Sequence, residues 1–128
     1  MQVRNLMHRE IFAVRPDQTL RDAAAIMHEH EVGSAVVLDD DQLAGILTER
    51  DVLRAVATGT DPGSAKVAEF MSRDVVAAAP NWDVAVAASE MTTRHFRHLV
   101  VREHNQVLGV VSVRDLLPVF LSNHSDDA

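Results

Sequence analysis

The sequence predicts a mixed fold of the α+β or α/β class, built from two β-α-β-β-α units packed with pseudo-two-fold symmetry. Three observations support this prediction. The chain matches itself at one constant offset, short apolar runs bounded by turn residues indicate strands, and segments of helical period follow capping residues. A single unit has too few elements to close a hydrophobic core alone, so we expect the two units to pack together.

The internal repeat needs no gap along its whole length. The offset is 64 positions, as the identical pairs show: Met7/Met71, Pro16/Pro80, Met27/Met91, Gly45/Gly109, Arg50/Arg114 and Asp51/Asp115. Two copies indicate an internal duplication and not a solenoid. We therefore expect residues 1–64 to form the first repeat and residues 65–128 the second, with residues 122–128 as a frayed tail.

Each repeat can be divided into elements from its hydrophobic period and its capping residues. The first is expected to contain a strand at 11–14, a helix from 19 to about 30, strands at 35–38 and 43–47, and a helix from 48 to about 57. A polar linker at 58–64 follows. The second is expected to contain a helical turn at 67–71, a strand at 75–78, a helix after Asp83, strands at 99–102 and 107–111, and a helix from 112 to about 121.

The composition limits the classes of function. Of the 128 residues, 47% are hydrophobic and 24% are charged, which is typical of a folded protein. The formal net charge of −7 makes nucleic acid an unlikely partner, because a phosphate-backbone binder normally carries a basic face. Absence of cysteine excludes disulfides and thiolate metal sites. With no signal peptide or membrane-spanning run in the sequence, we expect a soluble, cytoplasmic protein.

The two strand-to-helix junctions carry the polar motif Ser/Thr-x-x-Asp, at Thr48 to Asp51 and at Ser112 to Asp115. By itself this motif is a helix capping box that needs no ligand. A helix N-terminus also attracts phosphate, and a carboxylate one turn later suits the vicinal hydroxyls of a ribose. Gly45 and Gly109 precede the junctions, where they would allow close approach of another backbone segment or of a flat base.

Two β-α-β-β-α units that each end in Gly-apolar-apolar-(Thr/Ser)-x-x-Asp resemble a pair of cystathionine β-synthase (CBS) domains, the Bateman module. The resemblance covers the chain from about Leu6 to Phe120. It implies binding of adenosyl ligands, such as AMP, ADP, ATP or S-adenosylmethionine, in two clefts between the paired repeats. It also implies a homodimer formed through the helices. Because the chain shows no effector domain, we expect a separate, unidentified effector protein as partner.

The resemblance also implies site residues. Asp51 and Asp115 would hold ribose, and Thr48 and Ser112 would contact phosphate or sugar oxygens. Each cleft would add strand-entry residues: Val14, Arg15, Pro16, Val32, Gly33 and Ser34 for the Ser112/Asp115 cleft, and Ala78, Ala79, Pro80, Phe96, Arg97 and His98 for the Thr48/Asp51 cleft.

The copies differ at one pair of positions that bears on phosphate. Arg97 and His98 stand where the first copy has Gly33 and Ser34. Since Arg is a planar phosphate clamp, we hypothesise that the cleft around Ser112 and Asp115 carries the phosphorylated ligand, with Arg97 or His98 as its basic contact. The alternative is that both side chains are simply solvated at a strand entry.

Catalysis and metal binding have little support in the sequence. No nucleophile triad, phosphate loop or paired-carboxylate motif is readable, so we expect no enzyme activity. The seven histidines do not form a metal-binding motif, and neither a metal nor an obligatory cofactor is expected. The rival to an adenosyl-ligand sensor is a structural dimerisation module with no bound nucleotide.

Overall fold

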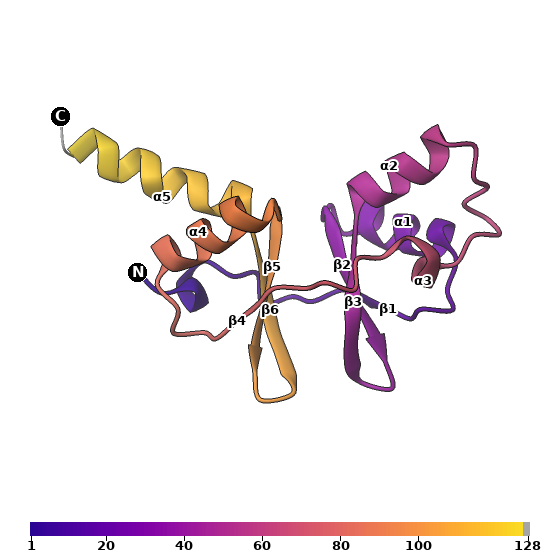
Figure 1. Ribbon diagram of the computed structural model, residues 1–128, viewed down its shortest axis with the longest axis horizontal. Coiled ribbons are helices and arrows are strands. Elements are labelled where there is room, and N and C mark those ends of the chain that lie inside the picture. Colours follow the sequence, from indigo (N-terminus) through magenta and orange to yellow (C-terminus); the bar gives the residue numbers. More distant parts are fainter. Residues whose placement is uncertain (127–128) are drawn as a thin grey trace. The chain divides into compact units, whose positions relative to one another are not determined.

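The structure is a computed structural model that describes the backbone of residues 1–126 and the side chains of residues 1–119. It contains two three-stranded sheets, each with helices packed beside it (Figure 1). The strands are β1 (Ala13–Val14), β2 (Ser34–Asp39), β3 (Gln42–Thr48), β4 (Ala77–Ala78), β5 (His98–Glu103) and β6 (Gln106–Ser112). The helices are η1 (Val3–Asn5), α1 (Leu20–Glu29), α2 (Glu49–Ala57), α3 (Val67–Phe70), α4 (Val84–Arg94) and α5 (Val113–Asp126).

The two sheets have the same topology and the same register. In the first, β1 pairs parallel with β2, and β2 forms an antiparallel hairpin with β3. In the second, β4, β5 and β6 repeat this arrangement. Ala13 pairs with Val36, and Ala77 pairs with Val100. The second pair therefore lies 64 positions after the first. The predicted fold class and the repeated β-α-β-β-α unit are therefore confirmed.

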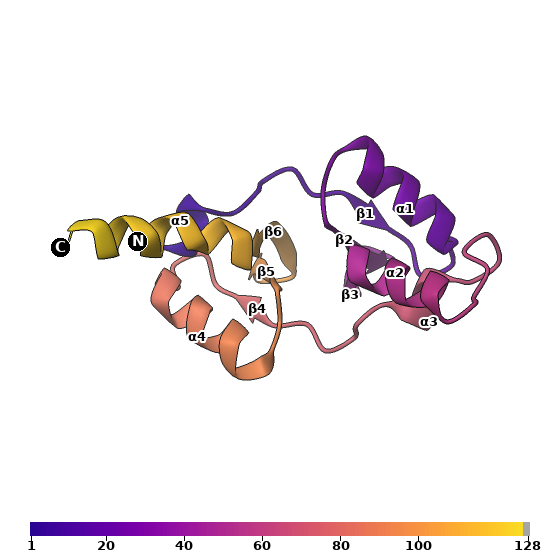
Figure 2. The same cartoon turned by 90° about the horizontal axis from the view of Figure 1, so that it is seen from above.

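The chain forms two compact units, and their residue ranges do not coincide with the two sequence repeats. The difference lies in the opening segment of each repeat. The first-sheet unit comprises Ile11–Val75, and the second-sheet unit combines Met1–Glu10 with the chain from Val76 onward. The backbone of η1 bonds to the segment before α4, since the Val3 and Arg4 N–H groups donate to the carbonyl oxygens of Trp82 and Pro80. Figure 2 shows α3 next to α2. The opening segment of each repeat thus packs in the unit that holds the other repeat's sheet.

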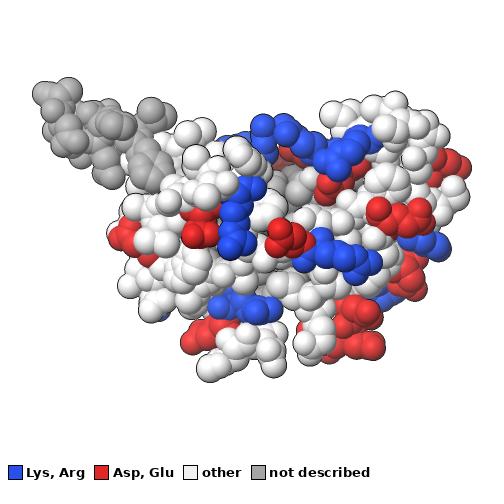
Figure 3. All heavy atoms as spheres, viewed as in Figure 1, with Lys and Arg blue, Asp and Glu red and all other residues white. Residues whose placement is uncertain are grey.

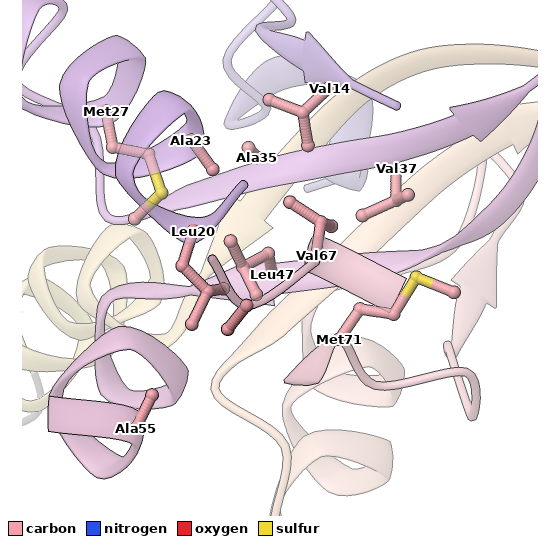
Figure 4. Close-up of a cluster of buried hydrophobic side chains, with 11 residues drawn as sticks. Val14, Leu20, Ala23, Met27, Ala35, Val37, Leu47, Ala55, Val67 and Met71 are labelled. Carbon is pink, nitrogen blue, oxygen red and sulfur yellow. The ribbon is translucent and has the colours of Figure 1, made fainter. Parts of the chain in front are cut away.

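The core of the first-sheet unit lies between its sheet and α1, α2 and α3 (Figure 4). Thr19 caps α1 in a capping box with Asp22, and the helix then buries Leu20, Ala23 and Met27, which share one face. The other buried members of this cluster are Val14, Ala35, Val37, Leu47, Ala55, Ala65, Val67 and Met71. The predicted amphipathic helix from Thr19 is confirmed.

The second-sheet unit has an equivalent core, which the first ten residues help to form. Val3 of η1 is fully buried, and its backbone N–H donates to the carbonyl oxygen of Trp82 at 2.9 Å. Trp82, the residue before the N-cap Asp83 of α4, packs against this core. The buried members are Val3, Val76, Ala78, Val84, Ala87, Met91, Leu99, Val101, Val111 and Leu116.

Three element boundaries differ from the sequence prediction. β1 and β4 each contain two residues and not four, because each is an edge strand that pairs on one side only and approaches a proline. The last helix was expected to end near Leu121, but α5 continues to Asp126. Residues after Leu121 include no Gly or Pro that would stop a helix. The frayed tail expected at 122–128 stays a prediction, and residues 127–128 lie outside the described part.

Gly45 and Gly109 allow the close approach of another backbone segment. This was one of the two alternatives that the sequence raised, the other being a flat base. A Cβ at Gly45 would lie 2.4 Å from the carbonyl oxygen of Ser72, and a Cβ at Gly109 would lie 2.7 Å from that of His8. Ser72 pairs with Ile46, and His8 pairs with Val110, as isolated antiparallel bridges. Each glycine therefore makes room for the opening segment that packs in its unit.

The surface is mixed in charge. On the face shown in Figure 3, Lys and Arg side chains are interspersed with Asp and Glu. Among the residues that the structure describes, none of the helices combines the length and the apolar character needed to cross a membrane.

Candidate functional site

The first junction joins the end of β3 to the start of α2. Thr48 has extended backbone dihedral angles and is the N-cap of α2, and its hydroxyl accepts a hydrogen bond from the Asp51 backbone N–H at 3.3 Å. The carboxylate returns the interaction. Asp51 Oδ2 accepts from the Thr48 backbone N–H at 2.8 Å and from the Thr48 hydroxyl at 3.0 Å. Asp51 is the buried charged residue of this junction, with 8% of its surface exposed.

The second junction repeats this arrangement at the end of β6. Asp115 Oδ2 accepts from the Ser112 backbone N–H at 2.8 Å and from the Ser112 hydroxyl at 3.0 Å. The distances equal those at the first junction, so the predicted equivalence of the two motifs holds at the level of single atoms. The capping box is complete at the first helix start, and the second has its carboxylate half; both use one carboxylate oxygen only.

The other carboxylate oxygen, Oδ1, makes no capping bond and can accept a hydrogen bond from a ligand at each junction. A carboxylate offers about four acceptor positions over its two oxygens, and both capping bonds fall on Oδ2. The side chains of Asp51 and Asp115 are 10% and 18% exposed, so each Oδ1 lies in a largely desolvated setting. An acceptor in such a setting gains more from a hydroxyl donor than it would in water.

Backbone N–H groups at the helix starts are less available than the sequence suggested. The Glu49 N–H donates to the Gly33 carbonyl oxygen at 3.0 Å, and the Val113 N–H donates to that of Arg97 at 2.9 Å. The N–H groups of Thr48 and Ser112 are bonded to the carboxylates. The expectation that the helix starts present unpaired N–H groups to phosphate is therefore wrong for these four groups, which strand pairing and capping occupy.

A different basic residue approaches Oδ1 at each junction. Arg54, one turn further along α2, places Nη2 3.6 Å from Asp51 Oδ1. At the second junction the partner is distant in sequence, because His8 Nε2 lies 2.9 Å from Asp115 Oδ1. The repeat offset matches Arg54 to Pro118 and His8 to Ser72, so neither contact can exist in the other copy.

Sequence reasoning missed His8. Its contact with Asp115 spans 107 positions and depends on the first ten residues packing in the second-sheet unit. One signal was available, since Met7 and Met71 are identical and each stands just before the residue that pairs beside a glycine. That identity indicated a shared packing role, but not which sheet each segment joins.

The strand-entry residues lie beside the junction of their own unit. Ser34 pairs with Thr48 across β2 and β3, next to the bond between Gly33 and Glu49. His98 pairs with Ser112 across β5 and β6 in the same way. The structure therefore places the backbone of Arg97 and His98 beside Ser112, in the unit of the second junction, and the Arg97 side chain is exposed. The resemblance assigned both residues to the Thr48/Asp51 cleft, and their contact with a phosphate at either junction stays a prediction.

Other candidate residues have structural contacts. The side chains of Val14 and Ala78 are buried in the two cores, so a ligand could reach only their backbone. Phe96 packs against the second core. The carbonyl oxygen of Pro16 accepts from the Ala68 N–H at 3.0 Å, and that of Pro80 accepts from the Arg4 N–H at 3.2 Å. Their assignment to a ligand site stays a prediction.

The α1 capping box provides a matched control for the junctions. Thr19 and Asp22 form the same reciprocal bonds as Thr48 and Asp51, at 3.1 and 3.2 Å. We expect Thr48→Ala and Thr19→Ala each to lower the free energy of unfolding by about 1 kcal/mol, because each removes one cap. Urea titration would measure both. A loss above about 3 kcal/mol for Thr48→Ala alone would contradict a simple capping role in folding.

The described part of the chain holds no cluster of three or more His, Asp or Glu side chains suited to a metal ion. The polar atoms that the junctions offer are hydroxyl and carboxylate oxygens, flanked by Arg97 and His98 at one of them. These groups can accept hydrogen bonds from ligand hydroxyls and attract an anion.

Comparisons with known proteins agree with this architecture. A family model described as CBS domain matches residues 3–58 and again residues 67–122. The CBS domain-containing protein YhcV of Bacillus subtilis is 36% identical over 124 residues, which cover 96% of this chain and 88% of YhcV. The crystal structure of the CBS-domain containing protein ATU1752 from Agrobacterium tumefaciens is 31% identical, with a TM-score of 0.85 over 94% of this chain and 99% of that one.

A third similar structure was solved with ligands. It is the CBS domain pair of protein MJ0100 in complex with 5′-methylthioadenosine and S-adenosyl-L-methionine. Its TM-score is 0.87 and its sequence identity is 22%, with 96% of this chain and 98% of that chain covered. At this identity the likeness concerns the fold.

Proposed function

The chain belongs to the CBS domain family as a pair of repeats, a regulatory module, and we propose that it binds an adenosyl ligand and signals ligand occupancy to a separate effector protein. The ligand class is AMP, ADP, ATP or S-adenosylmethionine. The observation that carries the proposal is the pair of equivalent junctions, in which the capping box leaves carboxylate Oδ1 to accept a ribose hydroxyl. The ligand complex of the MJ0100 pair supports the choice of ligands to test.

In this proposal each residue has a specific role. Asp51 and Asp115 accept hydrogen bonds from the ribose hydroxyls through Oδ1, and the capping bonds hold each carboxylate in place. The Thr48 and Ser112 hydroxyls already donate their hydrogen to Oδ2. Toward a ligand they can therefore act only as acceptors, for example from a sugar hydroxyl. Arg97 or His98 contacts the phosphate of a nucleotide at the Ser112 junction, where a cation compensates for the nearby carboxylate.

A regulatory role requires that ligand binding favours one state of the module over another. A ligand that binds one conformation or assembly better shifts the population by its difference in affinity, and an effector protein that recognises that state completes the signal. The junctions supply hydrogen-bond acceptors and nearby basic residues, which suit ligand binding, so we propose a sensor and not an enzyme.

The test is the thermal stability of the full chain with and without millimolar AMP, ADP, ATP and S-adenosylmethionine. A ligand present at about 100 times its dissociation constant adds roughly 2.7 kcal/mol to the free energy of unfolding. We expect at least one ligand to raise the melting temperature in proportion to the logarithm of its concentration. A flat response to the whole panel would overturn the sensor proposal and favour the structural dimerisation module.

The homodimer is a second part of the proposal, supported by exposed apolar side chains on the helices. Leu53 and Val56 on α2 are 68% and 56% exposed, and Leu117 on α5, the repeat counterpart of Leu53, is 52% exposed. Large apolar side chains grouped on one helix face indicate a protein interface. We expect Leu53→Glu with Leu117→Glu to convert a dimer to a monomer in sedimentation velocity, with Glu49→Lys as the control. An unchanged sedimentation coefficient would contradict this assignment.

A further inference from the structure

The contact between His8 and Asp115 occupies the atom that the proposed function assigns to ribose. Nε2 of His8 lies 2.9 Å from Oδ1 of Asp115, whereas both capping bonds fall on Oδ2. The His8 side chain is 69% exposed and the Asp115 side chain 18% exposed. A ribose hydroxyl arriving at Oδ1 must therefore share this oxygen with the imidazole or displace it.

The backbone of the opening segment places His8 at this point. Its N–H donates to the Val110 carbonyl oxygen at 2.9 Å, and its carbonyl oxygen accepts from the Val110 N–H at 3.2 Å. This two-bond bridge lies next to Gly109, which has no side chain to block it. The backbone of His8 is held against β6 on both sides of its Cα, so the side chain can leave Asp115 while the segment stays in place.

The first junction has the same bridge but not the same side chain. Ser72 exchanges two backbone hydrogen bonds with Ile46, as His8 does with Val110. The Ser72 hydroxyl donates to the Asp74 carbonyl oxygen at 3.5 Å. The cation near Asp51 is Arg54, and a guanidinium keeps its charge at every physiological pH. The two junctions therefore differ in whether their carboxylate faces a group that changes charge.

We propose that His8 controls ribose binding at Asp115 and makes it dependent on pH, whereas binding at Asp51 lacks this control; the inference rests on the proposed ribose-binding role of Asp115. Histidine is the side chain whose charge ordinarily changes between pH 5 and 8. A protonated imidazole donates a charge-assisted hydrogen bond to Oδ1, which is about twice as strong as a neutral one. Acidification therefore strengthens the competitor of the ribose hydroxyl.

In its own unit His8 contacts β6 and α5. β6 presents the backbone of Val110 to it, and α5 presents Asp115 and carries the exposed Arg114. On its own segment the adjacent charges are Arg9 and Glu10, both exposed, and Arg9 Nη2 donates to the Arg4 carbonyl oxygen at 3.5 Å. Asp115 is the described ionisable group that contacts the imidazole directly, so its carboxylate dominates the effect of protonation.

The experiment measures adenosine binding by calorimetry at pH 6 and pH 8. Adenosine contains the ribose but no phosphate and no group that titrates in this range, so attraction of phosphate to a protonated His8 cannot mask the competition. An Asp51→Asn background leaves the Asp115 junction as the intact ribose site. In that background we expect affinity to rise about tenfold from pH 6 to pH 8.

Two variants distinguish the proposed effect of His8 on ribose binding from a purely structural role of this residue. His8→Ser introduces the residue of the other repeat, and His8→Gln keeps a neutral N–H donor of similar reach. Both should bind adenosine with equal affinity at pH 6 and pH 8, and His8→Ser should bind at least as tightly as the histidine form at pH 8. A structural role would lower affinity equally at both pH values.

The outcomes distinguish this inference from the proposed function. A flat thermal response to AMP, ADP, ATP and S-adenosylmethionine, together with no binding of adenosine, overturns both. Equal adenosine affinity at the two pH values, or a pH dependence that persists in His8→Ser, overturns the inference alone. Binding of AMP without detectable binding of adenosine also overturns it, because ribose would then contribute too little for His8 to govern.

Discussion

Replacing Asp51 and Asp115 together with Asn should weaken adenosyl-ligand binding by at least about a hundredfold. Asparagine has nearly the same shape, and its amide oxygen can still accept the capping bonds that Oδ2 accepts. Its other terminal atom is an NH₂ group, which donates and cannot accept a hydroxyl hydrogen. Both junctions then lose the acceptor for ribose while the helix starts keep most of their capping.

Calorimetric titration with the ligand that gives the largest thermal stabilisation measures this effect. The matched control is Asp22→Asn, which makes the same substitution in the capping box of α1, a helix start outside the proposed site. Its ligand affinity should equal that of the natural sequence. A folded double variant with unchanged affinity would show that the carboxylates serve only as caps.

The second large effect concerns folding. Alanine at Gly45 would place a Cβ 2.4 Å from the Ser72 carbonyl oxygen and 3.1 Å from the Met71 sulfur, so the opening segment of the second repeat would have to move. Overpacking of this kind costs about 1–3 kcal/mol, and here a backbone atom and not a flexible side chain must yield. We expect a loss near the upper end of that range in urea titration.

Gly63→Ala is the control for this substitution. The nearest atom to a Cβ at Gly63 is Asp61 Oδ1 at 3.3 Å, the end of a side chain that can rotate away. Alanine also restricts the unfolded chain, so stability should stay within about 1 kcal/mol of the natural sequence. Equal stability of the Gly45 and Gly63 variants would contradict the close packing of Ser72 on β3.

Local patterns were sufficient to predict most of the fold. The capping residues Thr19, Thr48 and Asp83 begin helices where the sequence indicated, because a cap depends on residues three positions away at most. The hairpins follow equally from turn residues between apolar runs. The 64-residue offset then carried each assignment from one repeat to the other. The structure adds that the register shifts at equivalent places in the two hairpins, after Val37 and after Val101.

Features that depend on contacts distant in sequence could not be predicted in this way. The packing of the first ten residues against the second sheet rests on Val3 and on the bridge between His8 and Val110. No local pattern specifies which sheet such a segment joins. The contact of His8 with Asp115 follows from that choice, and so does the difference between the two junctions.

The geometry of the two junctions was predicted in part. The hydroxyl and carboxylate pairs form at both junctions with matching distances, and Arg97 and His98 lie beside Ser112. The backbone N–H groups differ from the expectation, because strand-entry carbonyl oxygens of Gly33 and Arg97 already occupy them. Hydrogen bonds between a strand entry and a helix start join segments that are separate in sequence, so the motif alone does not reveal them.

In the proposed function, Asp51 and Asp115 hold the ribose of an adenosyl ligand. The most direct measurement compares AMP with its 2′-deoxy and 3′-deoxy forms by calorimetry, in the natural sequence and in the Asp51→Asn/Asp115→Asn variant. We predict that loss of either hydroxyl weakens binding to the natural sequence about tenfold or more and leaves the residual affinity of the variant unchanged. Equal affinity of the natural sequence for all three nucleotides would contradict the account.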